Sequence, residues 1–124
     1  MNAYQAGYRR MLVDMHIPDW DPGFMREYDP IRMAELYERA NLSAVMLYCK
    51  SHTGLCNWPT KIGKMHTGLA GRDVVGELVT ELGKRGIATC AYTSVVFENW
   101  AVETHPDWRQ RTSTGFDAQD YTRY

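Results

Sequence analysis

The chain has 124 residues, with 14 Lys and Arg against 15 Asp and Glu and a formal net charge of −1 at pH 7. This length suits one small domain with a buried core. The near-neutral balance, without a basic stripe, argues against a protein that binds nucleic acid through phosphate contacts. No apolar run approaches the ~20 residues of a membrane span, and the first residues lack the apolar segment of a secretory signal. We therefore expect neither a nucleic-acid partner nor a membrane.

Three cysteines, Cys49, Cys56 and Cys90, make an odd count. Cys49 and Cys90 fall inside predicted strands, where a buried thiol stays reduced. This use of cysteine favours a cytoplasmic location. Neither a CxxC nor an HExxH spacing is present, so these signatures predict no metal and no other cofactor.

The first half of the chain reads as strand, helix and strand. Residues 11–17 predict a first strand, and a loop rich in turn residues follows it. Asp29 and Pro30 suit the N-cap and the first position of a helix, and Asn41 can end that helix in the left-handed conformation. The apolar run over residues 42–50 predicts a strand that is covered on both faces.

The second half repeats this pattern. Residues 74–82 carry an apolar stripe at helical spacing, and Gly86 suits the residue after a helix. A third strand is expected over residues 87–95. A third helical segment is predicted to begin near Phe97 and to end at the turn over residues 106–108.

The resulting order βαβαβα predicts an α/β fold with parallel strands and right-handed crossovers. Turns from helix to strand are one or two residues long, whereas the connection from Lys50 to Arg72 greatly exceeds the ~2–6 residues usual in such units. Long loops after the strands predict a site at the carboxyl ends of the sheet. We expect residues 1–8 to be an N-terminal extension, residues 9–108 the α/β unit, and residues 109–124 an irregular tail.

Three stretches at the predicted strand ends resemble one enzyme family. "KSHTGLCNWPTK" (Lys50–Lys61) resembles the Lys-His-His-Asp-Gly-Phe…Trp-x-Ser-Lys stretch after the second barrel strand of the family 29 α-L-fucosidases. "YTSVVFENW" (Tyr92–Trp100) is similar to their Tyr-Tyr-Ser…Glu-Trp stretch, and "VDMHIPDW" (Val13–Trp20) to the segment whose histidine touches the sugar. From "VDMHIPDW" through "THPDWRQ" the chain looks like the N-terminal part of the hypothetical glycosyl hydrolase 6 family, relatives of the family 151 α-L-fucosidases.

The resemblance implies three βα units of a (β/α)8 TIM-barrel-type fold. Such a barrel needs eight strands and typically ~250 residues, so the chain is expected to be a fragment, an apparently truncated barrel. The family nucleophile, an Asp, belongs to the end of a fourth strand. Retaining hydrolysis needs two carboxyl groups about 5 Å apart. We therefore expect a sugar-binding portion of a glycoside hydrolase that is not catalytically complete as this chain.

The resemblance also implies which residues bind the carbohydrate. His16 matches the strand-one histidine, and His52 matches the second histidine of the family pair. Lys50 matches the lysine at the end of strand two. Ser51 stands where the family has its first histidine, and Thr53 where it has an aspartate.

The residue chemistry leaves structural alternatives open. His16 could instead bond its own loop, and Lys50 could either hold a substrate oxygen or pair with a carboxylate such as Asp14. Trp58 could stack on the apolar side of a sugar ring or pack beneath the long loop. Tyr92 could belong to the site or to the core.

Glu98 is the one candidate catalytic carboxylate, either a general acid or a sugar ligand, and its alternative is an ordinary Glu at a helix start. A second hypothesis is a metal-dependent sugar isomerase or hydrolase, in which Asp14, His16, His52 and Glu98 converge on a divalent ion. A third is a non-enzymatic truncated α/β domain. The two open edges of three strands could also pair into a homo-oligomer.

Overall fold

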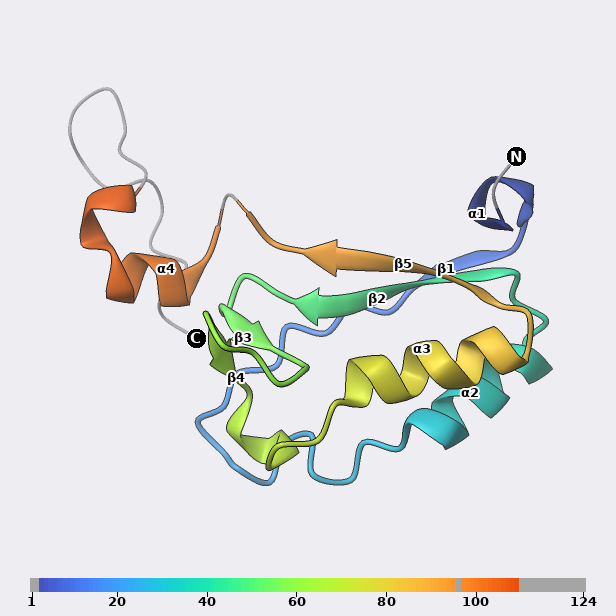
Figure 1. Ribbon diagram of the computed structural model, residues 1–124, viewed down its shortest axis with the longest axis horizontal. Helices are drawn as coiled ribbons and strands as arrows, with labels where there is room; N and C mark the ends of the chain where they lie inside the picture. Colours follow the sequence, from blue (N-terminus) through green and yellow to red (C-terminus); the bar gives the residue numbers. More distant parts are fainter. Residues whose placement is uncertain (1–2, 96, 110–124) are drawn as a thin grey trace.

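A computed structural model describes residues 3–95 and 97–109 (Figure 1). Its helices and strands, in chain order, are α1 (Ala3–Ala6), β1 (Arg10–Leu12), α2 (Pro30–Arg39), β2 (Ala44–Lys50), β3 (Leu55–Cys56), β4 (Lys64–Met65), η1 (Thr67–Leu69, a 3-10 helix), α3 (Val74–Lys84), β5 (Ala88–Thr93), α4 (Asn99–Thr104) and η2 (Pro106–Trp108, a 3-10 helix).

The sheet confirms the predicted parallel arrangement of the three main strands. Strand β2 lies between β1 and β5 and pairs with both in parallel. The short β3 pairs with the end of β2 in the antiparallel sense, at Lys50 and Cys56, and β4 pairs with β3 in parallel. Within the described residues β1 and β5 each pair with β2 alone, so the outer edge of each strand is open. The homo-oligomer that such edges could form stays a prediction.

The helix ends follow the predicted local chemistry. The Asp29 side chain accepts hydrogen bonds from the backbone N–H of Ile31 and Arg32, and Pro30 is the first residue of α2. Asn41 ends this helix with a φ of 54°, and Gly86 follows α3 with a φ of 67°. Both residues adopt a left-handed conformation that turns the chain back into a strand.

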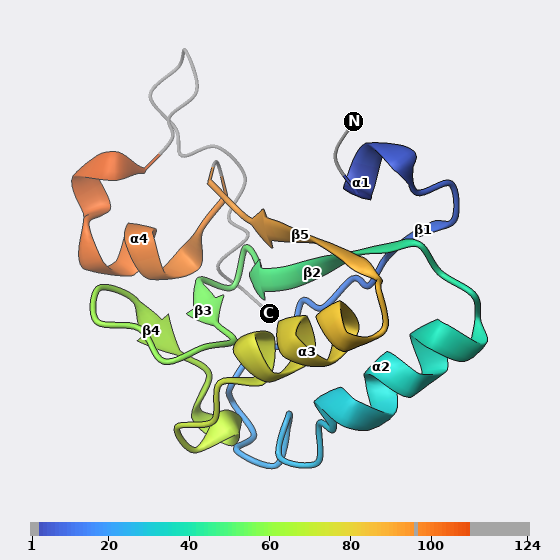
Figure 2. The ribbon, with the colours of Figure 1, turned by 45° about the vertical axis from the view of Figure 1, so that its right-hand side comes forward.

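Helices α2 and α3 both lie on one face of the sheet, with α1 and α4 near its two ends (Figures 1 and 2). Alternate residues of β2 point to this face, as the pleat of a strand requires. The resulting core contains Ala34, Tyr37, Val45, Leu47, Cys49, Leu78, Leu82 and Ile87, all of them buried.

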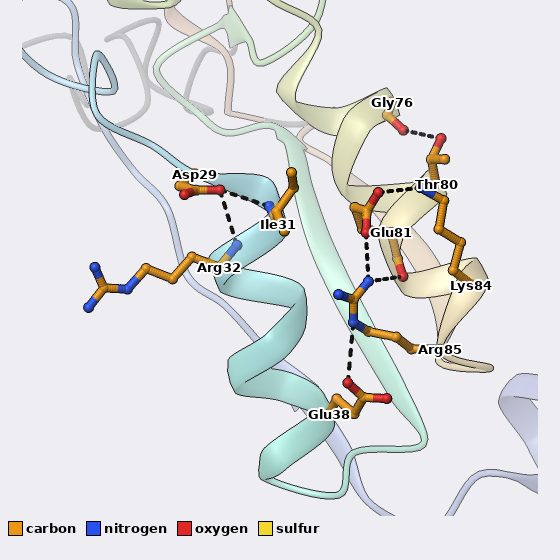
Figure 3. Close-up of polar contacts among 9 residues, drawn as sticks. All are labelled: Asp29, Ile31, Arg32, Glu38, Gly76, Thr80, Glu81, Lys84 and Arg85. Carbon is orange, nitrogen blue, oxygen red and sulfur yellow. Dashed lines mark hydrogen bonds and ion pairs between the residues drawn. The ribbon is translucent and has the colours of Figure 1, made fainter.

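Charged side chains link the two helices at the rim of this core (Figure 3). The Arg85 guanidinium lies 2.7 Å from Glu81 and 3.4 Å from Glu38 of α2. Glu81 also pairs with Lys84 at 2.6 Å. Hydrogen bonds from Lys84 and Arg85 lower the pKa of Glu81 and so keep its carboxylate charged.

A second small core contains Met25, Leu69 and Val74, which belong to the loop after β1, to η1 and to the start of α3. His66 is 1% exposed. Its Nδ1 accepts from the Gly68 N–H at 3.0 Å, so its Nε2 carries the proton and donates to the Pro18 carbonyl at 3.1 Å. A Cβ on Gly68 would lie 1.7 Å from the Phe24 carbonyl oxygen, so only glycine allows these two loops to meet.

The structure differs from the sequence expectation in the first strand, in the connection after β2, near the N-terminus and at the start of the last helix. The first strand covers residues 10–12 instead of 11–17, because it pairs with β2 alone and the chain leaves the sheet after Val13. The connection after β2 contains β3, β4 and η1, and α1 lies in the predicted extension. The last helix begins at Asn99 because Glu98 caps it. The expected tail lies outside the described residues from position 110 onward.

All three cysteines are free of disulfide bonds, and burial raises the pKa of the Cys49 and Cys56 thiols. Among residues 3–95 and 97–109, no helix combines the length and apolar character needed to cross a bilayer. The cytoplasmic location stays a prediction.

Candidate functional site

Four rings from three separate segments meet at the carboxyl ends of the main strands. His16 and His52 have ring centroids 4.2 Å apart, and the Tyr48 ring meets His16 edge-on at 5.0 Å. Tyr92 stacks on Tyr48 at 4.2 Å. We call these four residues the ring cluster. The structure therefore brings together His16, His52 and Tyr92, three of the residues that the sequence analysis singled out.

The register of the sheet explains this meeting. Tyr48 of β2 and Tyr92 of β5 are partners across a parallel pair, so both side chains point to the same face, away from α2 and α3. Sequence reasoning missed Tyr48, because it lies within an apolar run. Its place opposite Tyr92 would have identified it once the register was known.

Asp14 fixes the orientation of the His16 ring. Its Oδ1 lies 2.8 Å from His16 Nε2, and the Tyr48 hydroxyl lies 3.4 Å from the same nitrogen. A carboxylate can only accept, so His16 Nε2 carries a proton. In a neutral ring Nδ1 is then an acceptor, suited to a hydroxyl group of a ligand.

Two pKa shifts define the other donors and acceptors of the ring cluster. Burial, followed by the Asp14 carboxylate, raises the pKa of Tyr48 to about 12, so its phenol keeps the proton. Burial lowers the pKa of His52 below its ordinary 6.5, and the neighbouring His16 lowers it further. At neutral pH the His52 ring is therefore uncharged, with one nitrogen able to donate and one able to accept.

Lys50 pairs with a carboxylate, as one of its two readings predicted, but the partner is Glu98 and not Asp14. The Lys50 Nζ lies 3.0 Å from Glu98 Oε1, and the Glu98 side chain is only 5% exposed. The other Glu98 oxygen accepts from the Ala101 N–H and so caps α4. Both side chains are thereby engaged in joining the end of β2 to the segment after β5.

The loop after β2 and the start of α4 also approach each other closely through their backbones. Gly54 has a φ of 81°, and a Cβ at this position would lie 2.5 Å from the Trp100 backbone nitrogen. The Asn99 N–H donates to the His52 carbonyl at 2.9 Å. The start of α4 is thus held against the loop that carries His52.

The remaining candidates lie apart from the ring cluster or bond locally. Trp58 packs against the main core, which matches its packing alternative. The hydroxyls of Ser51 and Thr53 bond each other at 2.8 Å. Within the described part of the chain no three His, Cys, Asp or Glu side chains are placed to hold a metal ion, so the metal hypothesis has no ligand set there.

The family model for hypothetical glycosyl hydrolase 6 matches residues 29–123. That match covers well over half of the chain, so the chain belongs to the hypothetical glycosyl hydrolase 6 family.

The individual relatives are α-L-fucosidases. The tissue α-L-fucosidase of Homo sapiens is 32% identical over 92% of this chain and 25% of its own length. An α-L-fucosidase of Bacteroides thetaiotaomicron from family GH29 has a TM-score of 0.57 and 30% identity, over 76% of this chain and 20% of its own. The α-L-fucosidase isoenzyme 2 of Paenibacillus thiaminolyticus has a TM-score of 0.81 over 94% of this chain and 18% of its own, at 19% identity, which supports the fold alone. The chain spans about a quarter of the length of the curated relative.

Proposed function

We propose that the chain is the sugar-binding portion of an α-L-fucosidase-like glycoside hydrolase barrel, and that the ring cluster holds one sugar unit. The observation that carries this proposal is the meeting of His16 and His52, with ring centroids 4.2 Å apart, at the carboxyl ends of parallel strands. Ligands of barrel enzymes bind at this end of the strands. The neutral His52 imidazole and the protonated Tyr48 phenol suit an uncharged polyhydroxyl ligand, because such groups form directed hydrogen bonds without a net charge.

Lys50 and Tyr92 have indirect roles in this proposal. The Lys50 ammonium is paired with Glu98, so it positions the loop after β2. Tyr92 stacks on Tyr48 and holds that phenol beside His16. Glu98 has one oxygen on Lys50 and the other on the Ala101 N–H, which suits a positioning carboxylate better than a general acid.

We propose hydrolysis only for a complete barrel that contains this unit, and not for the chain alone. The relatives are about four times as long as the matched region, and retaining hydrolysis needs two carboxyl groups about 5 Å apart. We propose that the chain contributes recognition of the sugar and that the catalytic pair is completed by other strands of the barrel.

An NMR titration of the chain with L-fucose, and in parallel with galactose, tests this function. The account predicts saturable shifts of the His16 and His52 ring signals with one of these sugars, while the signals of His66, which is bonded to Pro18, stay constant. The His52→Ala variant should bind about tenfold more weakly, since it loses a directed hydrogen bond. The matched His105→Ala variant should keep the affinity. Unchanged His16 and His52 signals at saturating concentrations of both sugars would contradict the proposal.

A further inference from the structure

Asp14 is an accessible carboxylate beside the ring cluster, and the proposed function does not yet give it a contact with the ligand. Val13, the residue before it, packs against the main core, so Asp14 points to the opposite face of the sheet, where the ring cluster lies. The Asp14 side chain is 61% exposed, whereas that of His16 is 34% exposed. A ligand that reaches His16 therefore meets Asp14 as well.

Two donors of the ring cluster hold this carboxylate without using all of its acceptor positions. Asp14 Oδ1 lies 2.8 Å from His16 Nε2. Burial raises the pKa of Tyr48 to about 12, and a hydrogen bond between the Tyr48 hydroxyl and Asp14 contributes to this shift. An ionised carboxylate has about four acceptor positions on its two oxygens. The remaining positions are open to donors from the solvent or from a ligand.

The chemistry of Asp14 defines the ligand group that can face it. A carboxylate only accepts, so the ligand must bring a donor. A hydroxyl group of a sugar has one, whereas a deprotonated phosphate, sulfate or carboxylate has none. Hydrogen bonds to an ionised acceptor are roughly twice as strong as those between neutral groups. The Lys50 ammonium lies 3.0 Å from Glu98 and is engaged there, so it does not take this place.

We propose that Asp14 contacts the sugar directly and accepts a hydrogen bond from one of its hydroxyl groups. Asp14 then determines specificity, because a sugar that lacks this hydroxyl group leaves the carboxylate with one partner fewer. This inference rests on the proposed function and adds to it that the site requires a free hydroxyl group at one defined position of the sugar. A residue that acted only through His16 would be a positioning residue instead.

Binding measurements with sugars that each lack one hydroxyl group test the inference on the full chain. The probes are L-fucose and its monodeoxy analogues, or galactose and its analogues if galactose is the sugar that binds. The variants are Asp14→Ala, Asp14→Asn and His16→Ala. The control is Glu35→Ala, because Glu35 is an exposed carboxylate on α2, which covers the other face of the sheet (Figure 1). Circular dichroism verifies that each variant is folded.

For the unchanged chain, at least one analogue should bind about tenfold more weakly than the complete sugar, since it loses a hydrogen bond to a charged group. In Asp14→Ala this analogue and the complete sugar should bind equally, because the acceptor is gone. Asp14→Asn keeps a weaker, neutral acceptor and should keep part of the difference. His16→Ala should keep the whole difference for this analogue. Glu35→Ala should leave every affinity unchanged.

The failures of the inference and of the proposed function can be told apart. If a sugar binds and Asp14→Ala preserves every difference between this sugar and its analogues, Asp14 contacts no hydroxyl group. If Asp14→Ala and His16→Ala abolish the difference for the same analogue, Asp14 acts only through His16. Either result refutes the inference and leaves the proposed function standing.

Two further outcomes are equally decisive. If Asp14→Ala does not fold, Asp14→Asn takes its place, and an undiminished difference in that variant refutes the inference. If the unchanged chain binds neither L-fucose nor galactose, both the inference and the proposed function are refuted.

Discussion

The helix-covered face of the sheet and the carboxyl end of the same strands are held together by different forces. The helix-covered face buries eight apolar or aromatic side chains that form one contiguous core. The carboxyl end depends instead on the ring cluster and on the Lys50–Glu98 pair, whose members are far apart in the sequence. Stability therefore comes mainly from the helix-covered face, whereas a few ring contacts and one ion pair determine the geometry of the site.

The largest expected effect tests the helix-covered face. Leu82→Ala should lower the free energy of unfolding by about 2–5 kcal/mol, because the side chain is fully buried and its loss leaves a cavity. Urea denaturation measures this change. The His16 and His52 ring signals should stay in place. If Leu82→Ala shifts the His16 and His52 signals as far as Lys50→Met does, the two regions are not independent and the comparison is wrong.

The next largest effect tests the carboxyl end. Lys50→Met leaves the Glu98 carboxylate buried without its partner, and removal of one partner from a buried pair costs about 3–5 kcal/mol. Because the Lys50 side chain is 22% exposed, we expect about 2–3 kcal/mol after solvent screening, together with shifted His52 signals.

The control for this variant is Lys84→Met, which breaks the pair between Glu81 and a 63% exposed Lys84 side chain. Exposed pairs contribute below about 1 kcal/mol, and this variant should leave the His52 signals unchanged. Equal losses of stability in Lys50→Met and Lys84→Met would show that the Lys50–Glu98 pair is no stronger than a surface ion pair.

A pair of glycine variants sharpens the same comparison. Gly54→Ala and Gly86→Ala both place a Cβ on a residue with positive φ, but only at Gly54 does the new atom collide with Trp100. The left-handed conformation costs about 1–2 kcal/mol at either position. Urea denaturation should therefore show a larger loss of unfolding free energy for Gly54→Ala than for Gly86→Ala, and the difference measures the collision with Trp100. Indistinguishable losses would mean that α4 does not pack against this loop.

The smallest effect concerns pH. The pKa of His52 is lowered in the folded chain, so below about 6.5 the unfolded chain binds the proton more readily. This residue's contribution to stability is therefore present above pH 6.5 and is lost as the pH falls. An NMR titration should give His52 a midpoint below 6.5, and His52→Gln should flatten the corresponding part of the stability profile. A midpoint above 6.5 would contradict burial of the ring.

Local chemistry predicts the helix-covered face well. Asp29 and Pro30 begin a helix, Asn41 and Gly86 end helices, and these signals need no knowledge of distant segments. The order of the main strands and helices follows from them. The candidates at the strand ends were also available from the sequence, because parallel strands place their carboxyl ends together.

Contacts between distant segments could not be predicted in the same way. Lys50 and Glu98 are 48 positions apart, as are His66 and Pro18, and neither pair leaves a periodic pattern. The short strands β3 and β4 have two residues each, too few for an alternating signal.

The central claim is that parallel strands bring His16 and His52 together at one end of the sheet. An NMR experiment that detects proton pairs closer than about 5 Å tests it directly in a sample labelled at histidine and tyrosine. The account predicts cross-peaks between the rings of His16 and His52, whose centroids are 4.2 Å apart, and between those of Tyr48 and Tyr92. Cross-peaks between Tyr48 and Tyr92 without any between His16 and His52 would contradict it.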